Sequence, residues 1–318
     1  MKLNTSKLIF FNVINMSTII SFSVNNWLTM WILMELTLFM FIPLMSKNKI
    51  NDQSMKYFII QSFSSYLFMF SMLMNSINET SLDSLLTLIS LSMKVGLSPF
   101  HLWKPEIMTK LSWKECILLT TLIKITPMIL INKIISLKMI TLPLIFNLIV
   151  GSASGLNQLN LKKMMAFSSV FNLSWMISSF LISKKILLTF LTMYFILNFK
   201  IMTLFKENNV IFKNQLLSMN IQFKTKINML FLSISGLPPL TGFLPKLIIL
   251  NELMKNSMHI SIWMILTSIT SIYMYIQMNT FSFTNFFLKK KTNKFFMKKN
   301  FTKINLLMFP MMMYIWMN

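Results

Sequence analysis

Four ionisable side chains, Glu35, Lys94, Lys124 and Lys246, each lie well inside a long apolar run. A charge facing lipid costs at least a few kcal/mol, roughly 2.5–3.5 on insertion scales, so such groups pair, face a bundle interior or contact water. Burial favours the neutral amine of a lysine, and a nearby carboxylate favours the ammonium. A lysine that gains and loses a glutamate partner can therefore release and retake a proton. We interpret the four residues as a proton pathway.

Glu35 and Lys94 are the pair that the spacing brings together. At a rise of 1.5 Å per residue, Glu35 lies about 12 Å and Lys94 about 18 Å from the same side of the membrane. We therefore expect the two side chains to form an ion pair near mid-membrane. The alternative is that a lysine snorkels to the nearer interface, and it stays open for Lys94 and Lys124. For Lys200, near a polar loop, snorkelling is the preferred interpretation.

Helix breakers accompany three of these charges: Gly96 and Pro99 follow Lys94, Pro127 follows Lys124, and Lys246 closes the stretch 235–246, which holds two Gly and three Pro. Proline removes a backbone hydrogen bond and kinks a helix. Broken backbone survives in a membrane only where protein or water satisfies the freed groups, and such breaks mark ion pathways in transporters. Pro143 has no charge close by, and we interpret it as a packing kink.

The elements that must position these charges are transmembrane helices. The chain has 318 residues, of which 55% are hydrophobic and only 12% charged, whereas soluble domains run near 25% charged. We expect an all-α integral membrane protein, one polytopic domain over 1–318, with several helices broken near mid-membrane. The apolar runs long enough to span fall at 8–24, 27–45, 56–74, 82–99, 113–132, 139–157, 164–182, 186–205, 228–251, 258–280 and 304–317. That makes about eleven helices, the last of them short.

The loop lysines test this count and orient the chain. If the runs alternate, 21 lysines fall on the N-terminal side, among them Lys104, Lys110 and Lys114, and five fall on the other side. A bias of this kind places the N-terminus on the matrix or cytoplasm-equivalent side and, with an odd number of spans, the C-terminus on the opposite side. The first apolar run lacks a small-residue cleavage site, so we interpret it as the first span.

Several function classes have little support. The formal charge of +22 could suggest nucleic-acid binding, but the lysines lie in short breaks between apolar runs. The single Cys116 excludes an internal disulfide and an iron–sulfur ligand set. His101 and His259 are far apart without nearby Cys, which argues against haem or zinc, and no Gly-rich nucleotide fingerprint exists. We expect no cofactor and no metal in this chain.

Two weaker signals carry alternatives. His101 follows Pro99-Phe100 at a helix end, where it could relay protons from Lys94, and an interfacial structural role is the alternative. The segment 151–155, Gly-Ser-Ala-Ser-Gly, has small-residue spacing typical of close helix contact, which we prefer over a ligand site.

These motifs resemble the antiporter-like membrane-arm subunits of respiratory complex I. The segment 93–106, Met-Lys-Val-Gly-Leu-Ser-Pro-Phe-His-Leu-Trp-Lys-Pro-Glu, is similar to the lysine helix and following break of that family, and 31–35 is similar to its glutamate helix. The stretch 235–246, together with 155–169, resembles the subunit-2 branch. The likeness runs from about residue 27 to about residue 255.

The resemblance implies an eleven-helix mitochondrial inner-membrane subunit, shortened at its N-terminus relative to fourteen-helix bacterial relatives. Glu35 and Lys94 would be a switchable ion pair, Lys124 a central relay in a broken helix and Lys246 the terminal lysine. NADH, FMN, iron–sulfur clusters and ubiquinone would be bound by other subunits, and the partners would be other membrane-arm subunits and the lipid bilayer. Many relatives carry His where this chain has Asn172, so a titrating group there is not expected.

Two other functions remain as hypotheses. A free-standing cation/proton antiporter could use the same charges, although Glu35 is the one clear mid-span carboxylate and a metal cation would need more. A structural subunit whose charges no longer conduct is the other.

Overall fold

The computed structural model describes residues 5–45, 52–77, 81–134, 137–238 and 240–288. In these residues helices make up nearly all of the regular structure. Seven of the described helical stretches are long and apolar enough to cross a membrane: Thr5–Ser23, Trp27–Met45, Asp52–Ser76, Trp113–Lys133, Leu161–Ile182, Lys184–Glu207 and Met258–Thr280. The expected all-α membrane fold is confirmed. The eleventh run, 304–317, lies outside the described residues.

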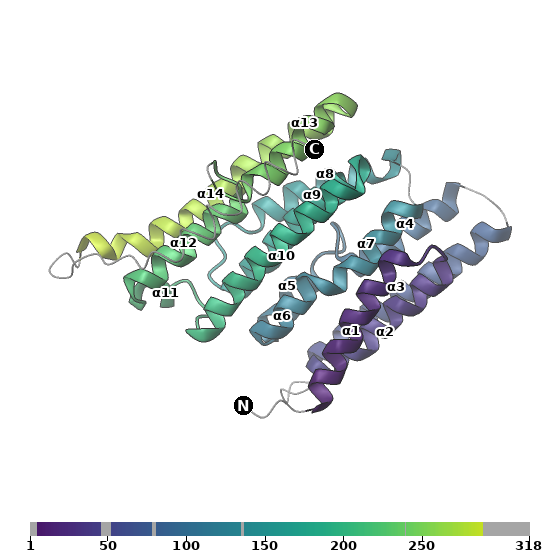
Figure 1. The fold of residues 1–318 in the computed structure, drawn as a ribbon, viewed down its shortest axis with the longest axis horizontal. Helices are drawn as coiled ribbons and strands as arrows, with labels where there is room; N and C mark the ends of the chain where they lie inside the picture. The colour runs from purple at the N-terminus through teal and green to yellow at the C-terminus, as the bar shows by residue number, and fades with distance from the viewer. Residues whose placement is uncertain (1–4, 46–51, 78–80, 135–136, 239, 289–318) are drawn as a thin grey trace. The chain divides into compact units, whose positions relative to one another are not determined.

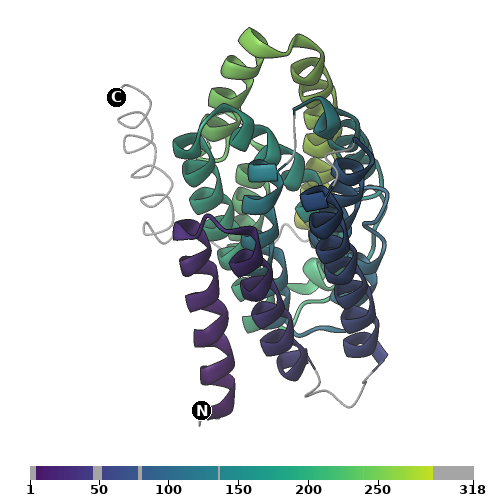
Figure 2. The same cartoon turned by 90° about the vertical axis from the view of Figure 1, so that its right-hand side faces the viewer.

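The chain forms two compact units, Met1–Asn147 and Leu148–Asn318. The first contains α1 (Thr5–Ser23), α2 (Trp27–Met45), α3 (Asp52–Ile77), α4 (Ser81–Val95), α5 (Trp103–Lys110), α6 (Trp113–Thr120), the 3₁₀ turn η1 (Leu122–Lys124), α7 (Ile125–Ile134) and the start of α8 (Leu137–Ala153). Helix α1 forms a hairpin with α2 (Figure 2), α3 packs on α4, and α7 contacts α1, α2 and α4.

The second unit is built around α9 (Leu161–Ile182), which packs against α10 (Lys184–Glu207). The short α11 (Gln215–Ser218) precedes α12 (Ile221–Ser235), α13 (Phe243–Asn256) and α14 (Met258–Leu288). Figure 1 shows α12 and α13 following one another along the same line, with α14 beside both.

Buried serines of α9 are compatible with a core helix because they bond to their own turn. Ser168, Ser169, Ser174, Ser178 and Ser179 each donate to the carbonyl three residues earlier. A buried hydroxyl is costly only without a hydrogen bond, so this polar face can pack inside the unit.

The run 228–251 is a broken helix, as the glycines and prolines of 235–246 predicted. Helix α12 ends at Ser235 and α13 begins at Phe243. Gly236 takes a left-handed backbone with φ +83°, which ends α12 in the manner of a C-terminal glycine cap. The run 82–99 is corrected, because α4 ends at Val95 and a second short helix, α5, follows the break.

Candidate functional site: buried lysines at helix breaks

The predicted ion pair is present in the first unit. Nζ of Lys94 on α4 lies 3.0 Å from Oε1 of Glu35 on α2, and their side chains are 4% and 16% exposed. Snorkelling of Lys94 is therefore wrong, because its ammonium is directed at a carboxylate inside the protein. Removing one partner of a buried pair leaves an uncompensated charge, so each residue stabilises the other where it stands.

The break after α4 has its freed groups satisfied by side chains. Gly96, with φ +76°, closes the helix as its N–H bonds to the carbonyl of Ser92. The carbonyl of Lys94 accepts a hydrogen bond of 3.2 Å from Gln61, and that of Val95 accepts one of 2.8 Å from Nζ of Lys104. The Lys94 site thus lies on a helix end whose last carbonyls are capped by other elements, as broken membrane helices require.

Lys124 occupies a second irregular point. It ends η1, directly before α7, and is 4% exposed. Pro127 explains the irregularity, since it has no N–H to bond the carbonyl of Ile123 and its ring crowds that group. Just before the turn, the hydroxyls of Thr120 and Thr121 bond to carbonyls of α6. The snorkelling alternative is wrong for Lys124 as well, because its side chain is buried in the unit.

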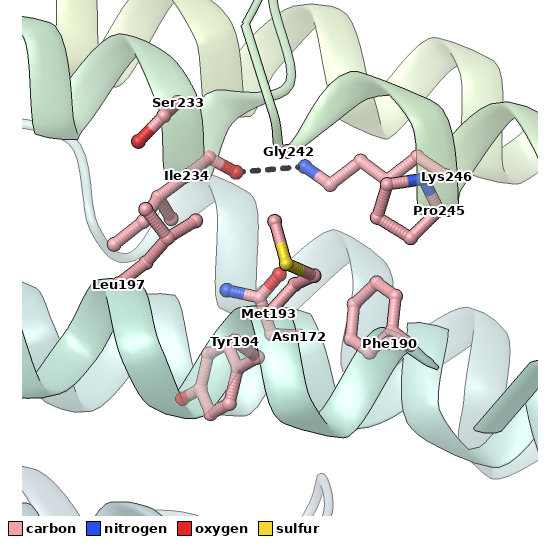
Figure 3. A pocket seen from close by; sticks show the side chains of 10 residues that line it. All are labelled: Asn172, Phe190, Met193, Tyr194, Leu197, Ser233, Ile234, Gly242, Pro245 and Lys246. Atoms are coloured by element: carbon pink, nitrogen blue, oxygen red, sulfur yellow. Dashed lines mark hydrogen bonds between the residues drawn. The ribbon is translucent and has the colours of Figure 1, made fainter. Parts of the chain in front are cut away.

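Lys246 in the second unit is held by the end of a broken helix. Its Nζ donates to the carbonyl of Ile234 at 3.0 Å (Figure 3) and to the carbonyl of Ser235 at 2.8 Å. These are the last two residues of α12. It also lies 5.6 Å and 5.4 Å from the ring centres of Phe171 and Trp175. Helix C-terminal carbonyls and aromatic faces both favour a cation. In the part of the chain that the structure describes, no carboxylate forms an ion pair with Lys246.

A small pocket adjoins Lys246. Figure 3 shows Asn172, Met193 and Tyr194 across it from the lysine. The volume open to water is about 20 Å³, and one buried water needs about 10–15 Å³ with two or more polar partners. The pocket therefore has room for a water beside the Lys246 amine, and Asn172 is a polar group that can bind it.

His101 lies in the break between α4 and α5. It is 9% exposed, and its ring hydrogen-bonds to the carbonyl of Pro99. It is close enough to Lys104 for their charges to interact. This position is compatible with both sequence interpretations, relay and structural residue.

Lys104 is not the solvated loop lysine that the sequence predicted. Lys104 was counted among matrix-side loop lysines, but it is 1% exposed and reaches back to α4. Its side chain lies within hydrogen-bonding range of Lys124. A signal was present: Lys104 follows the break glycine Gly96 much as Lys246 follows Gly236. Gln61 was missed too, and its amide in the middle of an apolar run was the available signal.

The expected packing role of 151–155 is confirmed. A Cβ on Gly151 would lie 2.6 Å from the backbone nitrogen of Phe171, and one on Gly155 would overlap the sulfur of Met274. Among the described residues, no group of three or more His, Cys, Asp or Glu could hold a metal ion.

Comparison with known proteins places this arrangement in a family. Residues 24–272 match the transmembrane family of NADH:quinone oxidoreductases and Mrp antiporters. NADH-ubiquinone oxidoreductase chain 2 of Locusta migratoria is 36% identical over 87% of this chain and 85% of its own. The chain belongs to the NADH-ubiquinone oxidoreductase chain 2 family.

Solved structures agree on the fold of this family. A chain of respiratory complex I from Thermus thermophilus has a TM-score of 0.75 at 17% identity, covering 90% of this chain and 72% of that one. A chain of the Mrp complex from Dietzia sp. DQ12-45-1b has a TM-score of 0.74 at 14% identity, covering 84% and 59%. These two chains share the helical fold described above.

Proposed function

We propose that this chain is a core membrane-arm subunit of proton-translocating NADH:ubiquinone oxidoreductase. Protons pass along a row of buried side chains, Glu35, Lys94, Lys124 and Lys246. The observation that carries the proposal is the 3.0 Å ion pair between Glu35 and Lys94 beside a helix break. The family membership indicates which enzyme the chain belongs to, because its named relatives are chains of NADH-ubiquinone oxidoreductase.

The pair works as a switch because burial and pairing oppose each other. With Glu35 at 3.0 Å, the Lys94 ammonium is stabilised; when the carboxylate moves away, the same ammonium is a costly buried charge and gives up a proton. A disturbance from neighbouring subunits that separates the pair would thus release a proton toward Lys124. Lys246 is the last carrier, and His101 is a candidate relay near the break.

In this proposal, the chain itself transfers no electrons. NADH oxidation and ubiquinone reduction take place in other subunits, which hold FMN and the iron–sulfur clusters. The partners of this chain are other membrane-arm subunits and the lipid bilayer of the mitochondrial inner membrane. The lysine bias is 17 to five once the buried Lys104, Lys162, Lys213 and Lys224 are set aside. It supports an N-terminus on the matrix side and a C-terminus on the intermembrane-space side.

The assembly claim is tested on detergent-solubilised inner membranes. They are separated on a native gel, stained for NADH dehydrogenase activity, and the chain is located by mass spectrometry. We expect it in the large active band. Recovery mainly in a small inactive band would instead favour a free-standing cation/proton antiporter, for which the likeness to an Mrp chain is the supporting observation.

The proton claim is tested by Lys124→Met in the assembled complex, with protons pumped per electron as the measurement. We expect pumping through this subunit to be lost. Lys114→Met is the matched control, because Lys114 is an exposed lysine of α6 in the same run. Unaltered pumping in Lys124→Met would leave a structural subunit as the better description.

A further inference from the structure

Lys104 is a buried lysine that the proposed pathway does not use. It lies in the first turn of α5, followed by Pro105, and is 1% exposed. A side chain that loses nearly all contact with solvent must keep its amine satisfied inside the protein. Lys104 therefore lies in an enclosed environment inside the protein and not in a solvated loop.

The amine is satisfied by a helix end. Nζ of Lys104 donates to the carbonyl of Val95, the last residue of α4, at 2.8 Å. The C-terminal end of a helix carries a partial negative charge that favours a cation. Its own neighbour, Trp103, adds a ring centre at 5.7 Å from Nζ.

The same local arrangement holds Lys246 in the second unit. There, too, a glycine with positive φ ends the first half of a broken helix, and a lysine from the second half donates to the last carbonyls. Each of these two broken helices thus contains a buried lysine that caps its own break. One of the two, Lys246, is already placed in the proton pathway, and Lys104 is its counterpart in the first unit.

Lys104 differs in having a lysine as a neighbour. The side chains of Lys104 and Lys124 lie within hydrogen-bonding range of each other. An ammonium has three donors and no acceptor, so two lysines can bond only when one is a neutral amine. A proton passing between the two amines leaves one nitrogen as it reaches the other, so one N–H bond breaks as the other forms and the total charge stays the same.

Other ionisable groups near Lys104 are His101, in the break, and the ion pair between Glu35 on α2 and Lys94 on α4. His101, in the connection before α5, interacts electrostatically with Lys104. The Glu35–Lys94 pair stands at the end of α4, one residue before the carbonyl that Lys104 caps. A proton leaving Lys94 therefore has Lys104 close to the point where the helix ends.

We propose that Lys104 is a further proton-carrying residue, which exchanges a proton with Lys124 beside the helix end that Lys104 caps. The proposal rests on the proposed function, since it adds a carrier to that pathway. With Lys104, the proposed pathway contains four buried lysines, the others being Lys94, Lys124 and Lys246.

The deciding variant is Lys104→Arg in the assembled complex. Arginine keeps a cation that can donate to Val95, but it stays protonated at all accessible pH. We expect NADH oxidation to persist while protons pumped per electron fall, with the loss in proton-transfer rate at about tenfold or more. The pH at half-maximal pumping should also move lower, because a fixed positive neighbour disfavours the protonated form of Lys124.

Lys104→Met and Lys104→Gln are measured beside it, with Lys110→Met as the matched control on the exposed side of α5. Low pumping in Lys104→Arg and Lys104→Met, with normal pumping in the control, supports the proposal. Normal pumping and an unchanged pH profile in Lys104→Arg overturn it and leave a capping role alone. Failure of all three Lys104 variants to assemble also overturns it, in favour of structural support.

The Lys124→Met variant distinguishes a failure of the Lys104 proposal from a failure of the proposed proton pathway. If Lys124→Met pumps normally, the pathway itself is wrong. If Lys124→Met fails to pump while Lys104→Arg pumps normally, only the role of Lys104 is wrong.

Discussion

Lys246 fills the space beside Gly236 that any larger residue would need. A Cβ on Gly236 would lie 2.9 Å from Cδ of Lys246 and 3.3 Å from its Nζ. Glycine is therefore required at this position for two reasons: its backbone is left-handed, and the Lys246 side chain lies directly against it. The break in α12–α13 and the position of the buried amine are one structural feature.

Gly236→Ala should disturb both functions of that glycine. A left-handed alanine costs about 1–2 kcal/mol, and its methyl group would displace the Lys246 side chain. We expect less assembled complex at elevated temperature and lower pumping per electron. Met229→Ala, on the exposed side of α12, is the control, and a Gly236→Ala complex as stable and active as this control would contradict the assignment.

Glu35→Gln should destabilise the first unit by leaving Lys94 buried without its carboxylate. Removing one partner of a buried pair costs about 3–5 kcal/mol. Thermal denaturation of the assembled complex measures this loss. The double variant Glu35→Gln with Lys94→Met should regain much of the stability without regaining pumping; a double variant that is no more stable than Glu35→Gln would show that the pair does not account for the loss.

Pro127→Ala should separate stability from conduction. Alanine restores the backbone N–H that proline removes, so η1 can become regular helix around Lys124. We expect assembly to be retained and pumping per electron to fall, because the lysine loses its irregular backbone. Pro143→Ala is the matched control, since α8 continues through that proline; equal pumping in both variants would argue that the break at Lys124 has no part in conduction.

Gly151→Ala should weaken packing in the second unit. The added methyl group would meet the backbone of Phe171 at 2.6 Å, and overpacking of this kind costs about 1–3 kcal/mol. The melting temperature of the assembled complex is the measurement. Ala153→Leu enlarges an exposed residue of the same helix and should change little, so equal effects of the two substitutions would remove the packing argument.

The sequence by itself determined the membrane class, the ion pair and the location of the breaks. Each follows from local properties: apolar runs long enough to span, the cost of a charge in lipid, and the lost N–H of proline. Those costs leave Glu35 and Lys94 few arrangements other than pairing, which is why their contact could be predicted before the structure.

Only the tertiary structure decided where the side chain of Lys104 lies and which carbonyls Lys104 and Lys246 cap. A hydropathy profile assigns a lysine after a helix break to a loop. The profile does not describe hydrogen bonds, so it cannot show a side chain that folds back onto the carbonyls of the preceding helix. Capping of Val95 by Lys104 and of Ser235 by Lys246 depends on how each broken helix packs in its own unit. The break frees the carbonyls, and the packing around them selects which lysine they hold.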